Sequence, residues 1–209
     1  MKTSKTLILL LALIVAEITH AQSVDGISGA SQQIAKNQTM KGETVICRGK
    51  EAHTAGKMLA IGKKAPDFKA VNGELAEVSL SDYRGKRVIL NIFPSLDTPT
   101  CAVSVRQFNA RASSLDNTVV LCLSMDLPFA QSRFCSVEGL ENVVPLSLFR
   151  NHGFFDKYGL QLADGPLEGL AARAVIVVDE QGKIIYTQLV EDISHEPDYD
   201  AALKALGES

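Results

Sequence analysis

Hydrophobic and polar positions follow two different periods from residue 87 onward. Apolar runs of strand length occupy 87–93 (RVILNIF) and 118–125 (TVVLCLSM), and a third run, which predicts a short strand, lies at 142–149 (NVVPLSLF). Uninterrupted apolar runs of this length are typical of strands that are buried on both faces of a sheet. We therefore predict a sheet whose central strands come from these segments.

Segments with helical spacing lie between and after these runs. A helix is predicted to follow Thr98, and the apolar positions that recur there at intervals of three and four are Val105, Phe108, Ala112 and Leu115. Further helices are predicted over 128–140, over 151–160 with its end at Gly159, and over 196–206. Helices therefore alternate with the predicted strands.

Two hairpins complete the predicted domain. Residues 43–56 (ETVICRGKEAHTAG) place apolar or β-branched residues on both sides of Arg48–Lys50, and 173–190 (RAVIVVDEQGKIIYTQLV) contains a glycine at its turn. The intervening segment 64–86 is predicted to be loop with one short strand. This order of elements predicts an α/β fold, a thioredoxin-like three-layer sandwich with a central mixed sheet and an N-terminal hairpin.

The first 42 residues lack this alternation. Residues 1–21 combine Lys2 and Lys5 with an apolar core over Leu7–Ala16 and small residues before a cut after Ala21, which is the pattern of a secretory signal peptide. The apolar core is too short to span a bilayer, and the alternative is an uncleaved N-terminal anchor. Residues 22–42 are polar and predict a flexible spacer. We expect an exported, periplasmic protein with one domain over 43–209.

Composition excludes several classes of partner. The 209 residues carry a net charge of −3, which becomes −4 once the signal peptide, with two lysines and one glutamate, is removed. Proteins that bind nucleic acid or anionic membranes need a basic excess to neutralise phosphates. We therefore expect neither nucleic acid nor a membrane as a partner.

The cysteines and histidines limit the possible chemistry. In an exported protein all four cysteines (Cys47, Cys101, Cys122 and Cys135) would meet an oxidising compartment. No C-x-x-C motif is present, so neither a zinc ribbon nor a thioredoxin-type redox pair is indicated. The four histidines are scattered along the chain. We expect no metal site.

One cysteine occupies a position that favours the thiolate. Thr98 suits the N-cap of the predicted helix and Pro99 its first position, so Cys101 lies in the first turn. There the sulfur faces unpaired backbone N–H groups and the positive end of the helix dipole, both of which stabilise a thiolate. The alternative is a small buried cysteine that happens to lie near a cap.

The residues around this cysteine resemble those of a known family. PSLDTPTC (94–101) matches P-x-x-x-T-x-x-C, the active-site signature of peroxiredoxins. The wider stretch NIFPSLDTPTCAVSVRQFN, with LPFAQSRFC and DGPLEGLAARAVIVVDEQGKIIYTQLV, is similar to the thiol peroxidase subfamily of atypical two-cysteine peroxiredoxins. The resemblance covers about residues 43 to 206, and it implies no cofactor.

The resemblance implies a role for each of five residues. Cys101 falls on the peroxidatic cysteine, which attacks a peroxide oxygen and becomes a sulfenic acid. Pro94 would shield that sulfur, Thr98 would hydrogen-bond to the peroxide, and Arg173 would support both thiolate and peroxide. Cys135 matches the resolving cysteine, which forms an intramolecular disulfide with Cys101. A thioredoxin-like protein would restore both thiols, and the family implies a homodimer.

Elementary chemistry agrees with these roles. Donors are needed where charge develops on the leaving oxygen, and Arg173, Thr98 and the helix-start amides supply them. A sulfenic acid over-oxidises irreversibly unless a thiol traps it. Because the two cysteines lie in separate predicted helices and a disulfide requires close Cα atoms, we predict redox-coupled local unfolding around 98–103 and 130–137.

The sequence predicts a peroxidase that reduces hydrogen peroxide and organic hydroperoxides, with a thioredoxin-like donor. One alternative is a thiol–disulfide oxidoreductase of the same fold, against which the missing C-x-x-C argues. Another is a non-enzymatic domain in which Cys101–Cys135 is a permanent structural disulfide.

The remaining cysteines and aromatic residues are expected to be structural. Cys122 lies in a predicted strand and is interpreted as an inert buried thiol. Cys47 departs from the family pattern and could be free, pair between molecules or bind a small thiol, whereas a bond to Cys122 is not expected. The aromatic residues expected in the core are Phe129, Phe154, Phe155 and Tyr158.

Overall fold

The structure is a computed structural model that describes residues 42–207. The predicted signal peptide (1–21) and all but the last residue of the predicted spacer (22–42) lie outside the described residues. Among residues 42–207, no helix has both the length and the apolar content needed to cross a membrane.

A seven-stranded mixed sheet forms the centre of the fold, in the order β4–β3–β7–β6–β5–β8–β9. Its strands are β3 (Lys69–Val71), β4 (Glu77–Ser79), β5 (Arg87–Ile92), β6 (Thr118–Ser124), β7 (Val143–Ser147), β8 (Ala174–Val178) and β9 (Ile184–Leu189). β5, β6 and β7 run parallel, and the other neighbours pair antiparallel. The three predicted apolar runs are these parallel strands.

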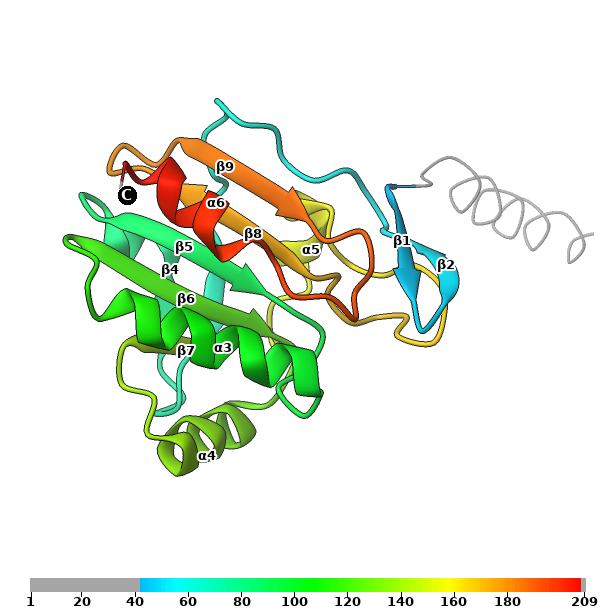
Figure 1. Ribbon diagram of the computed structural model, residues 1–209, viewed down its shortest axis with the longest axis horizontal. Helices are drawn as coiled ribbons and strands as arrows, with labels where there is room; N and C mark the ends of the chain where they lie inside the picture. The colour runs from blue at the N-terminus through cyan, green and yellow to red at the C-terminus, as the bar shows by residue number, and fades with distance from the viewer. Residues whose placement is uncertain (1–41, 208–209) are drawn as a thin grey trace, which may run out of the picture. The chain divides into compact units, whose positions relative to one another are not determined.

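Helices cover both faces of the sheet, as Figure 1 shows with α3 and α6 in front and α5 behind. α3 (Pro99–Ala112) and α6 (Tyr199–Ala205) pack on the face that includes Ile89 and Val175. α5 (Gly153–Tyr158) packs on the opposite face, which includes Leu90 and Ile176. Because neighbouring strand residues point to opposite faces, each apolar run contributes to both layers of the core. The three-layer sandwich predicted from the sequence is confirmed.

The parallel strands place the first turns of α3 and α4, the helices that carry Cys101 and Cys135, at one edge of the sheet. α3 follows β5, and α4 (Pro128–Glu138) follows β6 and packs against β7. The carboxyl ends of parallel neighbours lie at the same edge, so the first turns of α3 and α4 begin there (Figure 1). Cys101 and Cys135 are thus carried by two helices that leave the same edge.

The N-terminal hairpin forms a separate two-stranded sheet, with β1 (Thr44–Cys47) and β2 (Lys50–His53). Its turn places Arg48 and Gly49 at φ values of 52° and 74°, which are the left-handed values that a two-residue hairpin turn requires. The hairpin also holds the segment after β9: Ile46 N donates to Glu191 O at 2.7 Å, and Ile193 N donates to Ile46 O at 2.9 Å.

Two predictions about the fold were incomplete or wrong. The segment 64–86 contains two strands, β3 and β4, followed by the short 3-10 helix η1 (Leu80–Tyr83), because the turn after β3 folds the chain back on itself. Phe154, Phe155 and Tyr158 are buried as expected, whereas Phe129 is 63% exposed. Phe129 follows the first residue of α4, where its side chain lies on the solvent side of the helix.

Candidate active site

Cys101 is the third residue of α3 and is fully buried. Thr98 is the N-cap with extended backbone angles, and Pro99 occupies the first helical position, where its missing N–H removes no helical hydrogen bond. The N–H groups of Thr100 and Cys101 donate to no acceptor among residues 42–207. Two backbone donors are therefore available in the turn that carries the sulfur.

The Thr98 side chain does not cap the helix. Its Oγ1 donates to Ser95 O at 2.9 Å, and its backbone N–H donates to the same carbonyl at 3.1 Å. The hydroxyl closes the turn that precedes α3, and its lone pairs remain available to accept. The sequence correctly identified Thr98 as the N-cap residue. The Thr98 hydroxyl, however, bonds to Ser95 earlier in the chain and not to the first turn of α3.

Arg173 contacts Cys101 from a different segment of the chain. It directly precedes β8 and is 1% exposed. Its Nε donates to Ile193 O at 2.9 Å, and its Nη2 lies 3.3 Å from Cys101 Sγ. Among the described residues, no carboxylate forms an ion pair with this guanidinium, and Nη1 donates to no acceptor. A buried guanidinium needs an anionic partner, and a Cys101 thiolate is placed to be one.

The segment that fixes Arg173 also contacts the helix of Cys101. Thr100 Oγ1 donates to Ser194 O at 2.9 Å, one residue after the carbonyl that accepts from Arg173. The N-terminal hairpin holds Ile193 through Ile46. The backbone of Ile193 and Ser194 therefore joins the N-terminal hairpin, Arg173 and the first turn of α3.

Asp126 anchors the turn before α3. Its Oδ1 accepts from Ser95 Oγ at 2.7 Å, and its Oδ2 accepts from Leu96 N at 2.7 Å and from Ser124 Oγ at 2.7 Å. Pro94, at the start of this turn, is buried. The turn between Pro94 and α3 is thus fixed by a carboxylate that lies two residues after β6.

Cys135 lies in the last turns of α4 and is 8% exposed. Burial raises the pKa of its thiol. α4 is tied to α3 by Arg106, whose Nε and Nη2 donate to the two carboxylate oxygens of Glu138 at 2.9 and 2.8 Å. Arg106 also lies over the Phe134 ring, 5.6 Å from its centroid. All four cysteines are free thiols in this structure.

The other two cysteines form no hydrogen bond with Cys101, Arg173 or Cys135 among the described residues. Cys122 is 1% exposed, accepts from Asn91 Nδ2 at 3.6 Å, and burial raises its pKa to about 12. Cys47 is 1% exposed in a small cluster beneath the hairpin, separate from the cluster that contains Cys122. Burial also raises the pKa of Cys47. Both are placed as unreactive core residues.

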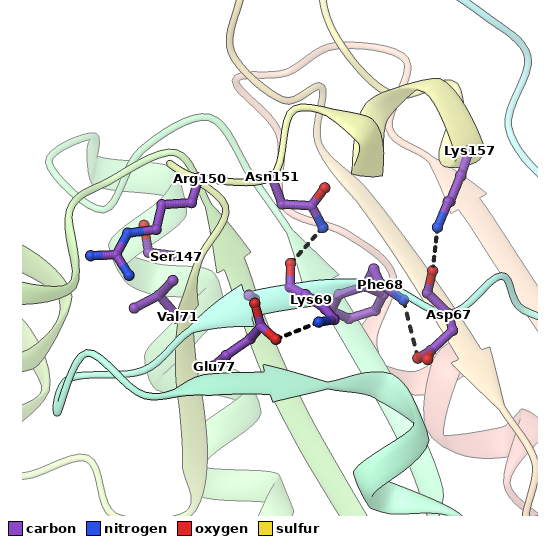
Figure 2. Close-up of a pocket in the computed structure, with 10 residues that line it drawn as sticks. Asp67, Phe68, Lys69, Val71, Glu77, Ser147, Arg150, Asn151 and Lys157 are labelled. Atoms are coloured by element: carbon purple, nitrogen blue, oxygen red, sulfur yellow. Dashed lines mark hydrogen bonds and ion pairs between the residues drawn. The ribbon is translucent and has the colours of Figure 1, made fainter.

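Surface recesses lie away from these groups. One recess, of about 370 Å³, is lined by β3 and by the segment leading to α5. Within it Lys69 pairs with Glu77 at 2.6 Å, and Asn151 Nδ2 donates to Lys69 O (Figure 2). Another, of about 420 Å³, lies beside η1. Neither is lined by a predicted site residue, and residues 42–207 contain no group of three His, Cys, Asp or Glu arranged to hold a metal ion.

The structure therefore brings together Cys101, Arg173, Thr98 and the turn of Pro94, and places Cys135 on the neighbouring helix. Sequence reasoning missed Asp126, which organises that turn. Its position directly after a buried parallel strand was a usable signal, because functional side chains gather at the carboxyl ends of such strands.

Comparison with known proteins agrees with this arrangement. The family model described as Redoxin matches residues 60–203. A thiol peroxidase from Corynebacterium glutamicum is 57% identical over 159 residues, covering 76% of this chain and 96% of that protein. A thiol peroxidase from Mycobacterium bovis is 52% identical over 163 residues, covering 78% of this chain and 98% of that protein.

Solved structures agree with the fold. A peroxiredoxin-like protein from Aquifex aeolicus is 36% identical, with a TM-score of 0.75 over 80% of this chain and 98% of that one. A thiol peroxidase from Chromobacterium violaceum, at 21% identity, shares the fold with a TM-score of 0.73 over 78% of this chain and 95% of that one. The expected thioredoxin-like architecture is confirmed. With a redoxin domain over most of its length and relatives above half identity along nearly their whole chains, this protein belongs to the thiol peroxidase family of peroxiredoxins.

Proposed function

We propose that the protein is a thiol-dependent peroxidase that reduces hydrogen peroxide and organic hydroperoxides at Cys101. The observation that carries the proposal is the buried contact of 3.3 Å between Arg173 Nη2 and Cys101 Sγ at the first turn of α3. A guanidinium and unpaired helix amides around one sulfur favour its thiolate form. The names of the relatives, thiol peroxidases at 57% and 52% identity, support the same activity.

The first step is attack of the Cys101 thiolate on the terminal oxygen of a hydroperoxide. The O–O bond breaks, the sulfur takes one oxygen as a sulfenic acid, and the remaining alkoxide or hydroxide leaves and takes up a proton. Negative charge grows on the leaving oxygen as this happens. Arg173 Nη1 and the N–H groups of Thr100 and Cys101, which have no acceptor among residues 42–207, are donors suited to that charge.

The second step pairs the two cysteines. The Cys135 thiol attacks the sulfenic sulfur, so an S–S bond forms between Cys101 and Cys135 and one water is released. A dithiol reductant of the thioredoxin class then reduces the disulfide and is itself oxidised to a disulfide. This step protects the sulfenic acid from irreversible over-oxidation. The position of Cys135 in the last turns of α4, which Arg106 and Glu138 join to α3, supports Cys135 as the partner.

The protein's setting belongs to the same proposal. The signal-peptide pattern of residues 1–21 supports export to the periplasm, where a thioredoxin-like protein of that compartment would supply electrons. Three exposed apolar side chains on and beside α4 support a homodimer contact: Leu127 at 51%, Phe129 at 63% and Val137 at 79% exposure. Sedimentation of the wild-type protein and of Phe129→Glu tests the dimer, which the variant is expected to weaken.

The activity itself is tested by following the state of each thiol. The reduced protein is mixed with one equivalent of hydrogen peroxide, quenched at intervals and mapped by mass spectrometry. We expect sulfenic acid at Cys101 first, then a Cys101–Cys135 disulfide, with Cys47 and Cys122 remaining thiols. Persistence of a free Cys101 thiol under these conditions would refute the proposal.

A further inference from the structure

The helix of Cys135 is held in place by a buried polar chain that ends at the turn before Cys101. We propose that Gln131, Ser124 and Asp126, together called the α4 latch, are positioning residues that set how fast Cys135 reaches the oxidised Cys101. This inference rests on the proposed peroxidase function and adds a control on its second step.

Gln131 is the inner end of the latch. It lies in α4 and is 1% exposed. Its Nε2 donates to Ser124 Oγ at 3.0 Å and to Leu146 O at 3.1 Å, so one side chain bridges the ends of β6 and β7. Its Oε1 is buried and accepts from no donor among the described residues. Two buried bonds therefore hold this helix to the sheet, while the unpaired oxygen offsets part of their stabilising effect.

Asp126 is the outer end of the latch. Its carboxylate accepts from Ser124 Oγ on one side and from Ser95 Oγ and Leu96 N on the other. Ser124 thus receives a bond from α4 and donates one to the carboxylate that fixes the turn before α3. Through Ser124 and Asp126, the segment 130–137 is connected to the turn that precedes the segment 98–103.

Gln131 and Cys135 move together when α4 opens. They are four residues apart, so both lie on the buried side of the helix. To bond with Cys101, Cys135 must leave that side, and the turn carrying Gln131 must then give up its bonds to Ser124 and Leu146. The latch therefore opposes the opening that precedes attack on the sulfenic sulfur, whereas the contacts of Arg173 with Cys101 do not involve it.

The direction of the effect follows from this geometry. Without the Gln131 bonds the closed position of α4 is less stable, while Cys101 and Arg173 stay in place. Disulfide closure should become faster while sulfenic acid formation keeps its rate. A residue with a merely structural role would lower stability without separating the two steps in this way.

The test compares Gln131→Met with wild type in single-turnover experiments on the full chain. Methionine keeps the length of glutamine and removes both donated bonds. Sulfenic acid formation is measured in the Cys135→Ser background, and disulfide closure is measured with Cys135 present. We expect closure about tenfold faster, the effect of losing roughly two net hydrogen bonds, and the first step unchanged within twofold.

The matched control is Gln161→Met, which removes the bond from Gln161 Nε2 to Gly169 O outside α4 and should change neither step. If Gln131→Met does not fold, as judged by circular dichroism, Ser124→Ala breaks the same chain at its centre and should also accelerate closure. Unchanged or slower closure in a folded latch variant overturns the proposal.

The failure of this inference is distinguishable from failure of the proposed function. If wild-type protein forms neither sulfenic acid nor the Cys101–Cys135 disulfide, the peroxidase function and the latch both fall. If wild type forms both and the latch variants close at the wild-type rate, only the latch is contradicted.

Discussion

Arg173 and Cys101 lie 72 residues apart in the sequence, yet the arginine Nη2 is 3.3 Å from the cysteine Sγ in the interior of the protein. Both residues are almost fully buried, at 1% and 0% exposure. Taking a guanidinium out of water is unfavourable unless an anion and hydrogen bonds compensate for the lost solvation. The Ile193 carbonyl accepts from Nε, and Cys101 Sγ accepts from Nη2. In the proposed function Cys101 reacts as a thiolate, and its charge and that of the arginine would then stabilise each other.

Arg173→Lys tests this mutual stabilisation. Lysine keeps the positive charge but cannot donate from a planar fork to Ile193 O and Cys101 Sγ together. We expect the rate constant for sulfenic acid formation to fall by about a hundredfold, as when one donor to a developing oxyanion is removed. Arg84→Lys, at an exposed position, is the control and should keep the wild-type rate. A wild-type rate in Arg173→Lys would show that the contact has no role in the chemistry.

Thr98 is predicted to act through its hydroxyl. Thr98→Val keeps the shape of the side chain but loses the bond to Ser95 O and the proposed contact with peroxide. We expect roughly a tenfold slower reaction with hydrogen peroxide, the effect of about one hydrogen bond to a charged group. Thr98→Ser should recover most of the rate because it restores the hydroxyl. Equal rates in the Val and Ser variants would exclude this role.

Disulfide formation is predicted to unfold two segments locally. Cys101 and Cys135 lie within intact helices when reduced, and the bond requires their Cα atoms to come within about 4.4–6.8 Å. In hydrogen exchange of the reduced and oxidised forms, residues 98–103 and 130–137 should lose at least about tenfold protection on oxidation, while β5 and β8 should not change. Equal protection of both segments in the two forms argues against the prediction.

Burial of Cys122 predicts a specific loss of stability in alkali. Its pKa is raised from 9.0 to about 12, so the unfolded chain ionises first as the pH rises. The stability that this thiol contributes is full below pH 9 and is lost between pH 9 and 12. Between pH 8 and 10 wild type should lose about 1 kcal/mol more of its free energy of unfolding than Cys122→Ala.

Urea unfolding of both proteins under reducing conditions measures this difference. For each protein, the free energy of unfolding is plotted against pH. Comparing the slopes of the two plots cancels the constant effect of the smaller side chain in Cys122→Ala and the contribution of the other buried groups that ionise in alkali. Parallel stability profiles for the two proteins would mean that Cys122 does not remain protonated in the fold.

Local patterns were sufficient to predict most of the fold. The apolar runs at 87–93 and 118–125 are buried on both faces, and Pro99 and Gly159 mark helix ends through their backbone geometry. The second strand in 64–86 was missed because β4 is only three residues long and not buried, so it has no apolar signature. Phe129 was misplaced because hydrophobicity alone does not tell which side of a short helix faces water.

The site was predictable where one segment contains it and less so where distant segments meet. The Thr98, Pro99 and Cys101 spacing follows from helix capping. Asp126 and Gln131 gain their roles only through contacts with another element, Ser95 and Leu96 before α3 for Asp126 and Leu146 in β7 for Gln131. The depth of Arg173 is likewise a property of the packed sheet, since its place before an apolar strand does not tell whether the guanidinium points into the fold or into water.

The most direct test of the peroxidase function is steady-state peroxide consumption with a thioredoxin and its reductase, comparing wild type, Cys101→Ser and Cys135→Ser. We predict no consumption by Cys101→Ser, and about one equivalent followed by arrest in Cys135→Ser, with Cys122→Ser turning over like wild type. Sustained turnover by Cys101→Ser, or a peroxide-inert wild type in which both substitutions lower only stability, would contradict the assignment of Cys101 as the reacting thiol.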